Sequence, residues 1–75
     1  MALSDGVLTD ATKRVDEARE RLERQRELIQ QLQEKGRDTS EAEALSQTMQ
    51  RTLEALEEDL RQIEDEMVGA KSDQS

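Results

Sequence analysis

Apolar residues recur along the chain with helical spacing, in two stretches that Gly36 separates. In the first stretch the recurring positions alternate in steps of three and four residues, the heptad spacing of a helix that packs against another helix. These positions are Leu8, Ala11, Val15, Ala18, Leu22, Gln25, Ile29 and Leu32. The pattern predicts a helix over residues 8–35.

The second stretch has the same spacing, and its recurring positions are Ala42, Ser46, Met49, Leu53, Leu56, Leu60, Ile63 and Met67. Ser40 followed three residues later by Glu43 is a capping-box pattern, in which the two side chains would satisfy free backbone N–H groups of the first turn. The pattern predicts a second helix over residues 40–68.

The segment between the stretches is typical of a turn. A lysine precedes Gly36, and a cation in the last helical turn followed by glycine commonly ends a helix. We therefore expect a turn at residues 36–39 inside one hairpin domain, residues 8–68. The polar ends, residues 1–7 and 69–75, are expected to be flexible tails.

The two apolar stripes match each other in antiparallel order. Moving forward along one helix of a hairpin means moving backward along the other, so facing residues have a nearly constant sum of residue numbers. The facing pairs are Leu8 with Met67, Ala11 with Ile63, Val15 with Leu60, Ala18 with Leu56, Leu22 with Leu53, Gln25 with Met49, Ile29 with Ser46 and Leu32 with Ala42. Small residues often face large ones, which favours dense packing. The sequence predicts an all-α, coiled-coil-like antiparallel two-helix hairpin.

Charges beside the stripes have opposite signs on the two helices. The flanking cations of the first helix are Arg14, Arg19, Arg21, Arg26 and Lys35, and the flanking anions of the second are Glu43, Glu57, Asp59, Glu64 and Glu66. Antiparallel pairing would bring together Arg19 with Glu57, Arg14 with Asp59, and apolar Leu28 with Leu45. Exposed ion pairs contribute under about 1 kcal/mol, so these charges would select the pairing more than stabilise it. A solvated face with incidental sign bias is the alternative.

Chain length favours assembly with a second copy. A chain of 75 residues lies near the size below which one core rarely suffices without disulfides, metals or oligomerisation, and this chain has no cysteine or histidine. We expect a homodimeric four-helix bundle. The residues expected in its core or interface are Leu8, Val15, Leu22, Leu28, Ile29, Leu32, Leu45, Met49, Leu53, Leu56, Leu60, Ile63 and Met67. A rod continuing through Gly36 and pairing with another chain is the rival geometry.

Gln25 is open to two interpretations. It could occupy a slightly wet core layer beside Met49, which we favour, or it could be a buried polar group that fixes the register of the helices.

The net charge of −8 opposes binding to nucleic acids and anionic membranes. Some hairpin dimers of similar architecture bind RNA, but the charge argues against that function here. No apolar run approaches the roughly 20 residues that cross a bilayer, and the first residues do not resemble a signal peptide. We expect a cytoplasmic protein.

Enzyme chemistry lacks suitable residues. The chain has no His, Cys or Tyr, so its serines have no evident activating base. Glu57, Glu58 and Asp59 could attract a divalent cation weakly, but a solvated run of charges explains them better. We expect no cofactor, no metal site and no catalysis.

A helical self-assembly or protein-interaction module is the expected function, with Leu28 and Leu45 as accessible apolar contacts. The alternative is an acidic regulator or nucleic-acid mimic that binds a basic protein surface. The outer face of the first helix supports that alternative through Asp16, Glu17, Glu20, Glu23, Glu27 and Glu34, although solubility alone explains such a coat.

Part of the sequence resembles a group of small uncharacterised bacterial helical-hairpin proteins. The matching segments are Arg24-Gln25-Arg26-Glu27-Leu28-Ile29 with Leu32, then Gly36-Arg37-Asp38-Thr39, Ala42, Ala44-Leu45, Met49 and Thr52-Leu53. The resemblance implies a helical hairpin and a bacterial origin, and it implies no activity. Histidines common near the end of that group's second helix are absent here.

Overall fold

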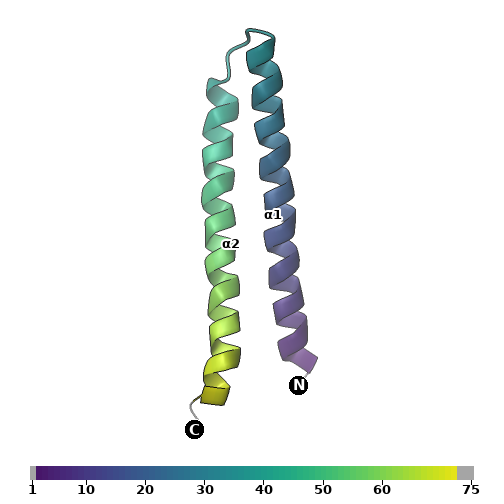
Figure 1. Cartoon of the computed structure of the whole chain (residues 1–75), viewed down its shortest axis with the longest axis vertical. Coiled ribbons are helices and arrows are strands. Elements are labelled where there is room, and N and C mark those ends of the chain that lie inside the picture. Colours follow the sequence, from purple (N-terminus) through teal and green to yellow (C-terminus); the bar gives the residue numbers. More distant parts are fainter. Residues whose placement is uncertain (1, 73–75) are drawn as a thin grey trace.

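The protein is an antiparallel pair of helices of equal length. The computed structural model describes the backbone of residues 2–72 and the side chains of residues 6–67. Helix α1 spans Ala2–Glu34 and helix α2 spans Ser40–Ser72, with 33 residues in each. The helices lie side by side, with the turn at one end and both chain ends at the other (Figure 1). The described residues contain no strand, so the all-helical prediction is confirmed.

Both helices extend into the segments expected to be tails. Residues 2–7 belong to α1 and residues 69–72 belong to α2, while residues 1 and 73–75 lie outside the described part. The chain contains no proline, and a glycine inside a helix costs only about 1 kcal/mol. Gly6 therefore does not stop α1, and a weak break in the apolar pattern is a poor guide to a helix end.

Helix α1 ends in a Schellman motif built on Gly36. This glycine has a φ of 69°, the left-handed conformation that disfavours residues with a Cβ atom. Its N–H donates to the carbonyl of Gln33 at 3.0 Å, and the N–H of Arg37 donates to the carbonyl of Leu32 at 2.8 Å. These bonds satisfy carbonyls at the helix end and turn the chain, so the hairpin closes on itself instead of continuing as a rod.

The start of α2 is held by different side chains from those expected. The Asp38 carboxylate accepts hydrogen bonds from the Ser40 N–H at 3.0 Å and from the Ser40 hydroxyl at 2.7 Å. The Thr39 hydroxyl donates to the Glu43 carboxylate at 2.7 Å, and the Glu43 N–H donates to the Thr39 carbonyl at 2.8 Å. The Ser40–Glu43 capping box is therefore wrong, because both the N–H and the carboxylate of Glu43 are bonded to Thr39. The bonds from Ser40, first from its side chain and then from its backbone, lower the pKa of Asp38.

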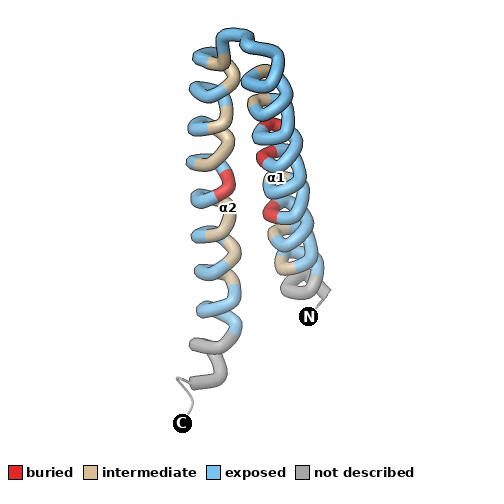
Figure 2. The backbone as a smooth tube through the Cα atoms, turned by 45° about the horizontal axis from the view of Figure 1, so that its top comes forward, coloured by how far each residue is buried: buried red, intermediate tan, exposed pale blue. Residues whose placement is uncertain are grey.

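The core is a short apolar cluster in the middle of the hairpin. Val15, Leu22 and Leu53 are buried. Ala18, Met49, Leu56 and Leu60 pack against them, so both members of three expected facing pairs lie in one cluster. The buried positions lie along the middle of the two tubes where these face each other, and most of the backbone is exposed (Figure 2).

The remaining positions of the two stripes are less covered. Leu8, Ala11, Ile29, Leu32, Ala42, Ser46 and Ile63 are half-buried, and Met67 is exposed. A hairpin alone therefore covers its stripes only in part.

Candidate interaction surface

The two sides of the helix seam are built differently. On one side, which we call the bridged flank, polar side chains span the helices. Arg19 Nη2 lies 2.9 Å from Glu57 Oε2, and Arg26 Nη2 donates to Gln50 Oε1 at 3.1 Å. These residues occupy the heptad positions on one side of the apolar stripes, and the bridges cover that side of the seam.

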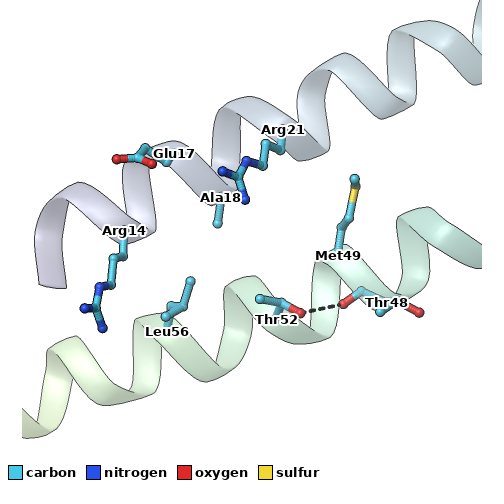
Figure 3. Close-up of a pocket in the computed structure, with 8 residues that line it drawn as sticks. All are labelled: Arg14, Glu17, Ala18, Arg21, Thr48, Met49, Thr52 and Leu56. Atoms are coloured by element: carbon cyan, nitrogen blue, oxygen red, sulfur yellow. Dashed lines mark hydrogen bonds between the residues drawn. The ribbon is translucent and has the colours of Figure 1, made fainter.

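The opposite side, which we call the open flank, is hollowed between the helices. One hollow of about 410 Å³ lies near the middle of the hairpin, and a second of about 380 Å³ lies nearer the chain ends. Both hollows share Arg14 and Leu56. The first is lined by Arg14, Glu17, Ala18, Arg21, Thr48, Met49, Thr52 and Leu56 (Figure 3), and the second by Val7, Asp10, Ala11, Arg14, Leu56, Asp59, Gln62, Ile63 and Glu66.

The hollows exist because small side chains of α1 face the open flank. Ala11 and Ala18 leave space opposite the larger residues of α2. Leu56 extends from α2 toward the space beneath Ala18, and Met49 extends from α2 toward α1 (Figure 3). The inner surface of the groove is therefore apolar, while arginines and acidic residues stand along its edges.

Large exposed apolar residues lie on the same flank. Leu28 is 44% exposed and Leu45 is 48% exposed, and Val7 is 48% exposed. By heptad spacing Leu28 follows Arg14 and Arg21, and Leu45 precedes Thr52, so the open flank ends in two leucines near the turn. Val7 lies three heptads from Leu28 toward the chain ends, with Arg14 and Arg21 between them.

The two expected ion pairs have different outcomes. Arg19 and Glu57 are in contact, as described above. Arg14 and Asp59 line the same hollow, but they form no ion pair; the pairs among the described side chains are Arg19–Glu57, Glu20–Arg24 and Glu58–Arg61. The Arg14–Asp59 prediction is therefore wrong within one chain. Both residues are exposed, and water competes well with such a pair.

Gln25 forms a hydrogen bond between the helices. Its side chain is buried, with 8% of the residue exposed, and its Nε2 donates to the carbonyl of Ala42 at 2.9 Å. No described buried side-chain nitrogen or oxygen lacks a partner. The contact favours the register-fixing interpretation over the wet layer beside Met49. Heptad spacing alone did not show that the amide reaches toward the turn.

Sequence reasoning placed Ala18, Met49 and Leu56 in the apolar stripes, but it did not single out the threonines that line the same hollow. Thr48 and Thr52 look like solvated polar positions, and each hydroxyl donates to the carbonyl four residues earlier. The difference between the two flanks could have indicated the groove from the sequence. One flank is polar throughout, and the other combines charged residues with leucine, valine and threonine.

The outer face of α1, as far as its side chains are described, is charged and exposed. The acidic residues on the outer face of α1 are exposed, namely Asp16, Glu17, Glu20, Glu23, Glu27 and Glu34. Among the described residues, no three His, Cys, Asp or Glu side chains are grouped to hold a metal ion. Neither helix, as far as it is described, has the length and apolar character needed to cross a membrane.

Comparison with known proteins gives no matching family model, no matching curated protein and no matching solved structure. The bacterial resemblance in the sequence stays a prediction, and function must be inferred from the geometry of the hairpin.

Proposed function

We propose that this protein is a non-catalytic self-assembly module whose hairpins pair into a homodimeric four-helix bundle. The observation that carries the proposal is surface area. The hairpin exposes 6153 Å², whereas a compact folded monomer of 8.6 kDa exposes about 4,700 Å². The excess of roughly 1,400 Å² exceeds the 800 Å² or so that a standard interface removes from each partner.

The partial burial of the stripes supports the same proposal. Leu56 and Met49 pack against the central cluster and also line the groove, and half-buried Ile63 lines its second hollow. Burying apolar surface is favourable by about 25 cal/mol for each Å². A second pair of helices over the groove would complete a four-helix core and bury these side chains.

Substitution at Leu56 tests the proposal. Leu56→Glu places a carboxylate at the inner surface of the groove and should halve the mass measured by light scattering. The matched control is Ala55→Glu, which adds the same charge at an exposed neighbouring position and should keep the dimer. Circular dichroism shows whether each variant remains helical. A wild type that is already monomeric would overturn the proposal.

A partner screen tests two other functions. A different helical protein could occupy the groove, in which case binding should depend on apolar residues and vary little with salt. An acidic regulator that binds a basic protein would use the exposed carboxylates of α1 and should lose binding at high salt. We place the protein in the cytoplasm under all three, because a chain without cysteine suits a reducing compartment.

A further inference from the structure

We infer that the open flank is the dimer interface and that the two hairpins pair with their turns at the same end, α1 of each copy lying against α2 of the other. The inference rests on the proposed self-assembly and adds its face and orientation. The bridged flank is a poor interface because all its positions are polar and its arginines already have partners on α2.

The open flank has a fixed order of residues from the chain ends to the turn. Val7 and Glu66 line the same hollow, as do Arg14 and Asp59. Arg21 and Thr52 line the next hollow together, and Leu28 and Leu45 follow one heptad further toward the turn. From the chain ends to the turn, the successive pairs therefore combine an apolar with an acidic residue, a basic with an acidic residue, a basic residue with a threonine, and two leucines.

When both turns lie at the same end, the twofold axis runs parallel to the helices. Each of these four pairs of residues, which we call levels, then faces the same pair in the partner. Leu28 then meets the partner's Leu45, and the reciprocal contact completes a layer of four leucines. Arg14 meets the partner's Asp59 twice. The arginine and aspartate that form no pair within one hairpin thereby gain partners between hairpins, where the interface excludes water.

Pairing with turns at opposite ends matches the levels in reverse order and places each helix against its own copy. Arg14 would then face the partner's Arg21, and Leu45 would face the partner's Glu66. Like charges placed together across an interface strongly disfavour the complex. Glu66 meets an apolar residue in either orientation, the partner's Val7 or the partner's Leu45, so the charged levels in the middle decide between the two. The order of side chains on the open flank therefore selects one orientation.

Spin labelling measures the orientation directly. The chain has no cysteine, so Arg37→Cys places one label in each exposed turn. Turns at the same end should give a short label-to-label distance set by helix spacings of about 10 Å. Turns at opposite ends should give a distance near the 60 Å length of the hairpin. Glu20→Cys, near the middle of α1, is the control that should give a short distance in either orientation.

Charge reversal gives an independent test. Arg14→Glu and Asp59→Arg alter exposed residues, so circular dichroism should show intact helices at concentrations high enough for each variant to dimerise. Each variant alone should dimerise at least about tenfold more weakly, because it places like charges together. An equimolar mixture should restore the wild-type dissociation constant, since the introduced carboxylate of one chain then meets the introduced guanidinium of the other.

The outcomes separate the inference from the proposed function. A monomeric wild type would overturn both. A dimer whose turn labels lie far apart would overturn only the orientation. In that dimer Arg14→Glu should strengthen pairing, because the introduced carboxylate would face the partner's Arg21. A dimer that neither charge reversal affects would place the interface away from the open flank.

Discussion

At the scale of single residues, a few side chains decide how the helices meet. Leu22 is only 4% exposed and lies in the central cluster with Val15 and Leu53. Gln25, one turn further along α1, is the described polar residue buried beside this cluster. The apolar cluster fills the middle of the seam, and the Gln25 amide joins the two helices by its bond to the Ala42 carbonyl.

Removing most of the Leu22 side chain should be costly. We expect Leu22→Ala to lower the free energy of unfolding by about 2–5 kcal/mol, because the substitution loses buried apolar surface and leaves a cavity. Glu23→Ala changes the exposed neighbouring residue and should stay within about 0.5 kcal/mol of wild type. Urea unfolding at one protein concentration provides the comparison. Equal effects of the two substitutions would show that the central cluster is not packed.

Replacing Gln25 by leucine should separate stability from register. A typical intramolecular hydrogen bond contributes about 0.5–1.5 kcal/mol net, and burying a leucine compensates for a loss of that size. We expect Gln25→Leu to melt within a few degrees of wild type but to give a mixture of registers or assembly states. Broadened or doubled NMR amide signals would show that mixture. A single sharp set of signals would mean that the apolar layers alone fix the register.

At the scale of the elements, the turn determines that the chain forms a hairpin. Gly36 adopts the left-handed conformation, and the Schellman motif around it satisfies carbonyl groups at the end of α1. Asp38 accepts a hydrogen bond from the Ser40 N–H at the start of α2. These contacts are local and involve few residues. They can therefore be tested without disturbing the apolar stripes.

The two described glycines should respond oppositely to alanine. A Cβ atom at either Gly36 or Gly6 would meet nothing within 4 Å, so backbone conformation alone decides the effect. Gly36→Ala should lower stability by about 1–2 kcal/mol because of the left-handed φ. Gly6→Ala, inside α1, should raise stability by up to about 1 kcal/mol. Thermal melts report both changes, at about 4–8 °C for each kcal/mol in a domain of this size. Equal stabilisation by both substitutions would contradict the turn geometry.

The contribution of Asp38 should depend on pH. Because its pKa in the folded protein lies below the ordinary value of 3.8, the carboxylate stabilises the fold fully above that value. The stabilisation is lost as the pH falls through the lowered pKa. Asp38→Asn should therefore melt below wild type at pH 7, and the difference should narrow steadily in acid. A difference that stays constant from pH 7 to pH 2 would mean that the charge of Asp38 plays no part.

Heptad spacing and Gly36 were enough to predict the hairpin, because burial of the stripes and the left-handed turn are strong local constraints. The outer ends of both helices and the Asp38 bonds were missed, whereas the helix ends at the turn were predicted to within one residue. A glycine inside a helix costs little, and several nearby polar residues compete to cap a helix at similar free energies. Arg14 and Asp59 illustrate the limit for the candidate surface. Charge complementarity predicted that they would pair, but the packing of Ala11 and Ala18 decides where the groove opens, and spacing does not contain that information.

At the scale of the whole molecule, shape is the strongest argument for assembly. The hairpin measures 60 × 19 × 13 Å, and the buried apolar side chains of its described part are those of the short central cluster, Val15, Leu22 and Leu53. Apolar residues on its open flank face solvent near the turn and along the groove. A second hairpin over this flank would form a bundle thick enough to bury both stripes.

Stability should consequently depend on protein concentration. If folding and pairing are coupled, the melting temperature rises as the protein is concentrated, because mass action favours the dimer. We expect a steady upward shift across a hundredfold range of concentration, measured by circular dichroism. Leu56→Glu should abolish that shift, whereas the exposed control Ala55→Glu should keep it.

Sedimentation equilibrium of the wild-type protein across a dilution series measures whether the hairpins pair. We expect a mass twice the chain's 8.6 kDa at high concentration, with helicity falling as the mass falls toward that of one chain. A fully helical protein whose mass stays at 8.6 kDa at every concentration would contradict the pairing, because the hairpin would then be stable with its groove open to water.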